Sequence, residues 1–251
     1  MSIQSGIGQR LLVNQYDLSG DVGSLSTFQA SRNQQDVTVL LDTAMRRLPL
    51  LKDGTVTFAA FFDAAAGASQ PVLSALPQSG LVSWLLSPTL GGVAGSMVAN
   101  ATTFAPDRGQ DGALVLNTTA VANATGVQWG NLLTAGVETI ASSASGTAID
   151  DYVPVFGTLP LPSVLGLSAY LHVVSIGSGT ATVHIQDSAD NVSFADVTGA
   201  AFTDVTAAGS QRIATGATQA VRRYLRVNFS NTFTALKCAV VVVRNVTEYQ
   251  A

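Results

Sequence analysis

The sequence predicts a mostly β protein of two domains with one short helix, and three observations lead to this prediction. Short segments rich in Val, Thr and aromatic residues alternate between apolar and polar positions along the chain of 251 residues. Clusters of Gly, Asn, Asp and Ser separate these segments, as expected of turns between strands. Helical spacing is clear in a single stretch, residues 64–78. We therefore expect a β-sandwich or barrel in residues 1–136 and a β-sandwich of the jelly-roll type in residues 137–251.

The N-terminal region is expected to contribute a polar arm and two strands. Residues 1–10 are polar and show no period, which is typical of an arm. Residues 11–16 predict the first strand, and residues 17–23, with a Ser-Gly pair and two aspartates, predict a turn. Residues 25–32 then return as a second strand.

Residues 36–63 carry two strand patterns that are joined by a basic corner. Apolar residues alternate over residues 37–42, which predicts a strand with one buried face. Residues 46–49, Arg-Arg-Leu-Pro, interrupt the pattern because proline lacks the amide hydrogen that a ladder needs. Lys-Asp-Gly at residues 52–54 predicts a turn, and residues 55–62 predict a second, half-buried strand.

The stretch that follows is the longest without charge, since no Asp, Glu, Lys or Arg occurs between Asp63 and Asp107. Within residues 64–78, Pro71 lies near the start of an apolar pattern of helical spacing, which predicts a short helix. Residues 81–86 predict a strand and residues 88–95 a glycine-rich loop before another strand. Although residues 81–99 are long enough to span a membrane, their proline and glycines favour a hairpin. An uncharged hairpin of this kind suits a contact between subunits.

A polar connector is expected at residues 104–112 and a strand at residues 113–117. Residues 137–167 are poor in charge and rich in Ser, Gly and Pro, which favours a linker and the first strand of the second domain. The second half has regular strand candidates, separated by turns and without helices between them. They are residues 169–176, 180–186, 194–197, 202–205, 211–214, 222–229 and 236–244.

The first half also resembles a known family in its ordered set of short motifs. Tyr-Asp-Leu-Ser-Gly-Asp-Val at 16–22 precedes Arg-Arg-Leu-Pro at 46–49, Leu-Lys-Asp-Gly-Thr-Val-Thr-Phe at 51–58 and Phe-Phe-Asp at 61–63. This order resembles the tail tube (major tail) proteins of long, non-contractile-tailed bacteriophages. The resemblance implies a structural protein of the virion tail that is made in the host cytoplasm. It further implies hexameric rings that stack into the tube through which DNA is ejected.

The second half resembles galactose-binding-like jelly rolls. The resemblance rests on residues 183–197 and on Arg-Tyr-Leu-Arg-Val at 223–227, and it is a loose motif. Two other functions therefore stay open: a capsid decoration or other accessory virion protein, and a carbohydrate-binding module.

The composition favours self-association over binding of nucleic acid. Only 11% of the residues are charged, against about a quarter in an average soluble protein, and 47% are hydrophobic. The net charge is −4, whereas a protein that binds nucleic acid through its phosphates needs a row of Lys and Arg residues on its surface. We expect the partners to be further copies of this chain and other tail proteins, with DNA passing through unbound and no membrane involved.

The sequence predicts neither an enzyme nor a bound cofactor or metal. The single cysteine, Cys238, lies in an apolar segment and is expected to be a buried thiol. We interpret the two histidines, His172 and His184, as surface residues, since a metal site would need a third ligand from an aspartate. The first residues lack the basic and apolar regions of a signal peptide, so we expect none.

Two sets of residues are the candidates for function. If DNA must slide through a tube, its wall should be acidic or neutral, because contacts of Lys or Arg with phosphate add affinity. The candidates that face the lumen are Asp17, Asp21, Asp36 and Asp42. The candidates for contacts between subunits are Arg46, Arg47, Trp84, Leu85 and Leu86. The basic pairs at 46–47 and 222–223 are either solvated strand ends or partners of acidic groups on a neighbouring subunit.

Overall fold

The protein is mostly β, as the sequence predicts. The computed structural model describes residues 6–75, 79–151 and 164–245. Over these residues it contains strands β1 to β19 and one short helix, α1. The chain forms two compact units, which are described separately below.

Both units are built from segments that are far apart in the sequence. The first unit comprises described residues of 1–19, 83–96 and 129–251, and the second comprises those of 20–82 and 97–128. Strands β5 (Ser79–Leu85) and β6 (Val93–Arg108) each have residues in both units. The predicted domain boundary after Gly136 lies inside the last segment of the first unit.

In the second unit, β3 (Val22–Asp36), β4 (Arg47–Phe61), β7 (Leu114–Ala122) and β6 pair antiparallel in this order as part of a larger sheet, in which β6 also pairs with β5 and β8 (Gln128–Leu132). One face is buried through residues that alternate along the two central strands, and α1 (Ser69–Leu73) contacts β7. The buried residues are Val56, Phe58 and Ala60 of β4 and Leu116, Thr118 and Ala120 of β7. This alternation confirms the predicted strand at 55–62, except that β4 ends at Phe61.

The prediction for residues 36–54 is wrong in three respects. Residues 37–46 form no strand but the loop that joins β3 to β4, and the apolar face expected to be buried is exposed. Pro49 lies inside β4 and pairs with Gln34 next to a register shift, a place where a strand tolerates proline. Gly54 is buried in the same strand and forms no turn. A Cβ atom there would lie 2.7 Å from Cγ2 of Val127, so close packing explains the glycine.

The uncharged stretch folds much as predicted, and the chain itself buries its apolar parts in α1, β5 and the first half of β6. The helix is confirmed and is shorter than predicted, because α1 has 5 residues; residues 76–78 lie outside the described part of the chain. The predicted strand, loop and strand are confirmed as β5, a turn and β6. The polar connector at 104–112 is mostly wrong, since β6 continues to Arg108. That extension pairs with β7, which makes a longer hairpin than the composition suggested.

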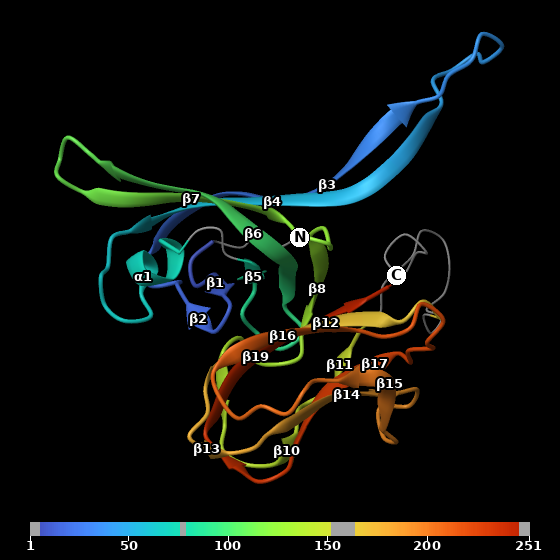
Figure 1. The fold of residues 1–251 in the computed structure, drawn as a ribbon. Coiled ribbons are helices and arrows are strands. Elements are labelled where there is room, and N and C mark those ends of the chain that lie inside the picture. Colours follow the sequence, from blue (N-terminus) through green and yellow to red (C-terminus); the bar gives the residue numbers. More distant parts are fainter. Residues whose placement is uncertain (1–5, 76–78, 152–163, 246–251) are drawn as a thin grey trace. The chain divides into compact units, whose positions relative to one another are not determined.

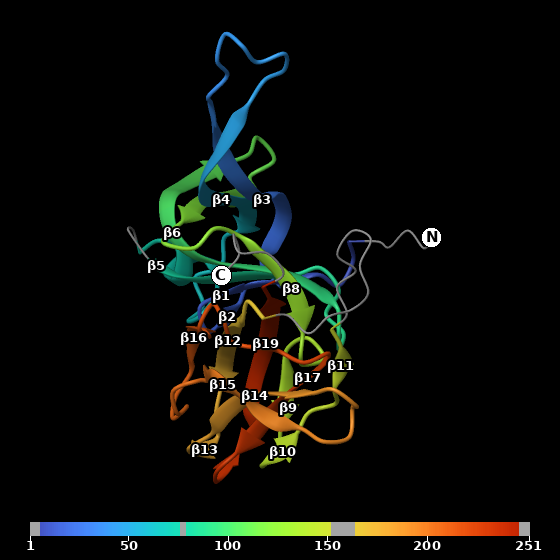
Figure 2. The same ribbon diagram turned by 90° about the vertical axis from the view of Figure 1, so that its right-hand side faces the viewer.

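The first unit is a β-sandwich (Figure 2). One sheet contains β16 (Gly209–Ala214), β12 (Leu167–Ser175), β19 (Leu236–Arg244) and β8 (Gln128–Leu132), and β9 (Glu138–Ile140) pairs with β19. The other contains β10 (Ala144–Ser145), β17 (Tyr224–Ser230), β14 (Thr182–Ser188) and β15 (Ala195–Ala201), and β11 (Ile149–Asp150) pairs with β17. The short strands β13 (Ser178–Gly179) and β18 (Phe233–Thr234) form a separate pair. Strands predicted at 169–176, 180–186, 211–214, 222–229 and 236–244 are thereby confirmed within a few residues.

A short hairpin at the N-terminus also belongs to the first unit. Residues 11–16 do not form one strand, because β1 (Arg10–Val13) and β2 (Tyr16–Asp17) pair across a turn. Asn14 makes this turn with a φ of 52°, in the left-handed region that asparagine tolerates better than most residues.

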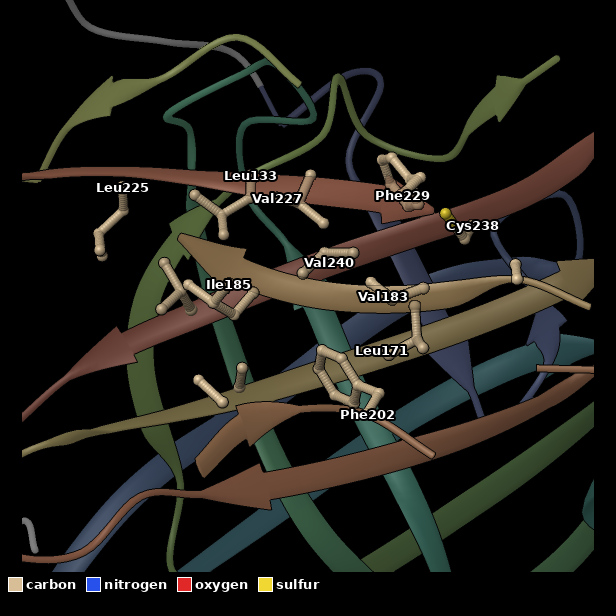
Figure 3. Packing of buried hydrophobic residues seen from close by; sticks show 14 of the residues in the cluster. Leu133, Leu171, Val183, Ile185, Phe202, Leu225, Val227, Phe229, Cys238 and Val240 are labelled. Carbon is tan, nitrogen blue, oxygen red and sulfur yellow. The ribbon is translucent and has the colours of Figure 1, made fainter. Parts of the chain in front are cut away.

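The sandwich core consists of apolar side chains that the two sheets direct toward each other (Figure 3). Val183 and Ile185 of β14 alternate with half-buried polar residues, and β12 and β19 are buried along nearly their whole length. The core also contains Cys238, which confirms the predicted buried thiol. Burial raises the pKa of this thiol, so it stays protonated.

His172 corrects the prediction that both histidines lie on the surface, since its side chain is 0% exposed. It lies on β12, where its Nδ1 is 2.6 Å from the carbonyl oxygen of Asn14 and its Nε2 is 2.7 Å from Oγ of Ser83. Oγ of Ser83 is in turn 2.7 Å from Oγ of Ser96. A neutral ring fits all three contacts, with Nδ1–H donating to Asn14 and Nε2 accepting from Ser83. Burial lowers the pKa of His172 to about 4.

Candidate assembly surface

The exposed face of the sheet in the second unit bears small residues without charge. Register places one threonine from each strand in a row across the sheet, and Oγ1 of Thr57 lies 3.3 Å from Oγ1 of Thr119. The row consists of Thr27 of β3, Thr57 of β4, Thr119 of β7 and Thr103 of β6. The adjacent row contains Ser24, Ala59, Asn117 and Ala105. These two rows therefore present hydroxyl, amide and methyl groups and no formal charge.

One side of this sheet ends in a long strand. Among the described strands, β3 pairs with β4 alone, over a length of 15 residues. Its pairing has three register shifts, which are irregularities that natural edge strands use to limit unwanted pairing. A strand of another chain could add to β3 only between these register shifts, as over Phe28–Arg32, where the pairing with β4 is continuous.

The β3–β4 hairpin extends beyond the sheet as an arm (Figure 1). β4 pairs with β7 only over Thr55–Phe61, so the preceding part of β4 pairs with β3 alone. We call residues 32–53 the arm. Eight of its large apolar side chains are exposed, and Leu40, Leu41 and Leu51 are at least 88% exposed. The full set is Val37, Val39, Leu40, Leu41, Met45, Leu48, Leu50 and Leu51.

The tip of the arm is held together by its own hydrogen bonds. The backbone N–H of Val37 donates to the carbonyl oxygen of Arg46 at 2.9 Å, and the N–H of Arg46 donates to Oγ1 of Thr38 at 2.9 Å. Asp36 accepts from both the N–H and the Oγ1 of Thr38, and these bonds lower the pKa of Asp36. Asp42 accepts from the N–H of Val39 at 2.9 Å. The tip is therefore a loop whose conformation is held by internal hydrogen bonds and whose apolar side chains are exposed. This arrangement is typical of a contact with another protein.

The four predicted lumen residues do not lie together on the uncharged sheet face. Asp17, on β2 of the first unit, forms an ion pair with Arg10 at 2.7 Å. Asp21 accepts a hydrogen bond from the N–H of Ser69, at the start of α1, at 2.8 Å. Asp36 and Asp42 belong to the arm. Each of these carboxylates already has a partner within the chain, and their exposure to a lumen stays a prediction.

The five predicted contact residues fall into two groups. Arg46 and Arg47 are exposed in the arm, where Arg46 lies 3.7 Å from Asp42. Trp84 and Leu86 of the first unit are half-buried, and the ring of Trp84 packs edge-to-face on Trp129 with centroids 6.4 Å apart. Leu85 is 0% exposed, so its side chain is fully occupied by contacts within the chain. Of the 16 large apolar side chains that are exposed among the described residues, eight lie in the arm.

The other basic pair, at residues 222–223, is occupied within the first unit. Arg223 donates to both carboxylate oxygens of Asp150, at 2.8 and 2.6 Å, and Arg222 lies 3.9 Å from Asp187. These contacts favour the interpretation as partly solvated strand ends.

Sequence reasoning missed the threonine row and the apolar tip. The alternation of Thr55, Thr57 and Ala59 was the available signal, because it marks the face opposite to Val56 and Phe58. Within the described residues, no group of three or more His, Cys, Asp or Glu is placed to hold a metal ion. No helix in that part of the chain is long and apolar enough to cross a membrane.

Comparison with known proteins adds little to this picture. No family model and no curated protein matches the sequence. Among solved structures, the Dit protein of SPP1, described as a paradigm of the hub adsorption apparatus in phages that infect Gram-positive bacteria, aligns with a TM-score of 0.32 and 9% identity. The alignment covers 94% of this chain and 98% of that chain. A TM-score this low does not establish a shared fold, so the role of that protein carries no argument for this one.

Proposed function

We propose that this protein is a structural virion subunit that assembles into stacked rings, hexameric in the pattern of the family it resembles, to form a phage tail tube. The observation that carries the proposal is the sheet of the second unit, whose central rows bear no charge and in which β3 pairs, among the described strands, with β4 alone. The ordered tail-tube motifs of residues 16–63 belong mostly to the same unit. β6 also pairs with β5 and β8, but it has 16 residues against the 7 of β5. In this proposal, β3 of one copy adds to the C-terminal part of β6 in the next copy, and repetition of this contact closes a ring.

The chemistry of the exposed face fits the wall of a DNA conduit. Between the arm and Asp107, the sheet presents no Lys or Arg that would bind phosphate and release counterions. The threonine and asparagine side chains hydrogen-bond water and form no ion pairs with the phosphates of the nucleic acid. The wall is therefore proposed to be neutral and to be formed by the threonine row in place of the four aspartates.

A catalytic role is not part of this proposal. Ser83 and His172 form the hydrogen bond expected of a nucleophile and its base, but both side chains are 0% exposed. Nδ1 of the histidine is used by a backbone carbonyl group, where a catalytic triad would have a carboxylate. The pair is therefore suited to holding segments of the first unit together.

Proline substitutions at Gln29 and Ala30 test the role of the β3 edge. These residues pair in continuous register with Thr55 and Gly54. In an antiparallel pair, consecutive N–H groups of an edge strand point alternately to the neighbouring strand and outward. One substitution should therefore unfold the arm locally, and the other should keep the fold and remove one outward donor. We expect the folded variant to lose ring formation, measured by light scattering and electron microscopy.

Circular dichroism identifies which of the two variants is folded, so each serves as the control for the other. A folded proline variant that still forms rings at the concentration of the unmodified protein would contradict pairing through β3. A wild-type chain that remains monomeric over a range of salt and concentration would contradict the proposed function as a whole.

A further inference from the structure

The charged residues of the second unit are confined to its two ends. From Val22 to Ser31, from Gly54 to Phe62, from Ala64 to Pro106 and from Ala113 to Gln128, the sequence contains no Asp, Glu, Lys or Arg. Every charge of this unit therefore belongs either to the arm or to the opposite end of the sheet. Charge confined to two ends of one body is the arrangement expected when the ends contact different surfaces.

The arm end is apolar and slightly basic. It contains Arg32, Arg46, Arg47 and Lys52 against Asp36, Asp42 and Asp53. Asp36 and Asp42 accept hydrogen bonds from backbone N–H groups of the loop. Arg47, the first residue of β4, is exposed. The exposed Leu48 follows Arg47 directly, and Nη2 of Arg47 lies 3.6 Å from Sδ of the exposed Met45. The arm therefore offers an apolar surface with positive charge at its margin.

The opposite end is apolar and acidic. β4 ends there at Phe61, which pairs with Val115 at the start of β7. Phe61 is 57% exposed, Phe62 45% and Leu114 36%, and the N–H of Phe62 donates to the carbonyl oxygen of Leu114 at 3.0 Å. We call these three residues the phenylalanine patch. The charges of this end are Asp21, Asp63, Asp107, Arg108 and Asp111, four acidic and one basic.

We propose that the arm of one copy docks on the phenylalanine patch of the next copy along the tube axis. The two ends match in the way that an interface requires, with apolar side chains at the centre and opposite charges at the rim. They lie at opposite ends of the same sheet, so the contact is head-to-tail. A head-to-tail contact that does not close on itself generates a filament, which is what stacking of rings needs.

This inference rests on the proposed function but concerns a different contact. The β3 edge joins neighbours within a ring, whereas the arm and the phenylalanine patch join one ring to the next. A second copy fits the arm better than an unrelated protein, because the chain itself carries the complementary acidic, aromatic surface. The two contacts can therefore fail separately in an experiment.

Charge reversal at the two ends provides the test. Arg47→Glu makes both ends acidic, and Asp107→Arg combined with Asp111→Arg makes both ends basic, because three arginines then outnumber Asp21 and Asp63. Asp107 and Asp111 are both exposed. We expect each variant alone to form rings but at least tenfold fewer tubes than the unmodified protein, because like charges meet at every stacking contact. An equal mixture should restore tubes, since rings of the two variants then alternate with matched ends. Electron microscopy and sedimentation distinguish rings from tubes.

Removal of apolar surface provides a second readout. Leu40→Asn with Leu41→Asn should abolish stacking and leave rings, and Val192→Asn is the matched control, because Val192 is 80% exposed in the first unit. Tubes that form normally from the charge-reversed or leucine variants would overturn the inference, as would a mixture of the two charge variants that remains as separate rings. If the unmodified protein gave rings and never tubes, this inference would be wrong while the ring contact still held.

Discussion

Replacement of Asp151 by alanine is expected to destabilise the first unit by about 3–5 kcal/mol, because it leaves a buried arginine without its counter-charge. The side chains of Arg244 and Asp151 are 5% and 3% exposed, and Nε of Arg244 donates to Oδ2 of Asp151 at 2.8 Å. Asn131 donates to the other carboxylate oxygen at 2.7 Å. Arg244 also donates from Nη1 to the carbonyl oxygen of Val221 at 2.7 Å. The pair thus ties the end of β19 to the segments before β17 and after β11.

Urea unfolding monitored by circular dichroism measures this loss. The double variant Asp151→Leu with Arg244→Met should recover much of it, since it removes both charges from the interior together. The matched control lies one residue away. Asp150 and Arg223 form an ion pair at 2.6 Å with side chains 42% and 46% exposed, so Asp150→Ala should cost only about 0.2–1 kcal/mol. Equal losses for the two alanine variants would show that burial does not govern these pairs.

Acidification from pH 6.5 to pH 4 is expected to cost roughly 3 kcal/mol of stability through His172 alone. Burial lowers its pKa from the ordinary 6.5 to about 4, so the unfolded chain binds a proton in this range and the folded chain does not. The contribution is fully present above pH 6.5 and is lost as the pH falls, by up to about 1.4 kcal/mol per pH unit. Below pH 4 the folded state binds the proton as well, and the loss levels off.

The variant His172→Gln isolates this effect from the titration of carboxylates. Its amide oxygen can accept from Ser83 but cannot take up a proton in this range, so the slope between pH 6.5 and pH 4 should decrease. The matched control is His184→Gln, since His184 is only half-buried and hydrogen-bonds Ser230 at 3.2 Å on the outer side of β14. Chemical unfolding at a series of pH values gives the slopes. Parallel slopes for the unmodified protein and the His172 variant would refute the assignment.

The sequence alone determined the fold class, the long strands β12, β14, β17 and β19 of the sandwich and the absence of charge along the middle of the sheet in the second unit. It did not determine β15, because one strand that ends at Ala201 replaces the separate strands predicted at 194–197 and 202–205. Strands such as β14, β17 and β19 were predictable because alternation or a continuous apolar run reports local burial, and the turns between them use Gly, Asn and Asp. The short helix was predictable from Pro71 and the apolar spacing after it. The burial of Cys238 followed from its apolar neighbours.

Only the tertiary structure decided which apolar faces are covered. Residues 37–42 alternate as a buried strand would, yet they are not buried. They belong to the loop before β4, and β4 pairs with β7 only from Thr55 onward, so no other strand of the described residues covers this loop. His172 is buried because the Asn14 turn and Ser83, both far away in the sequence, converge on its ring. The two units combine distant segments in the same way. A sequence pattern records the period of a segment, but burial depends on partners that the rest of the chain supplies.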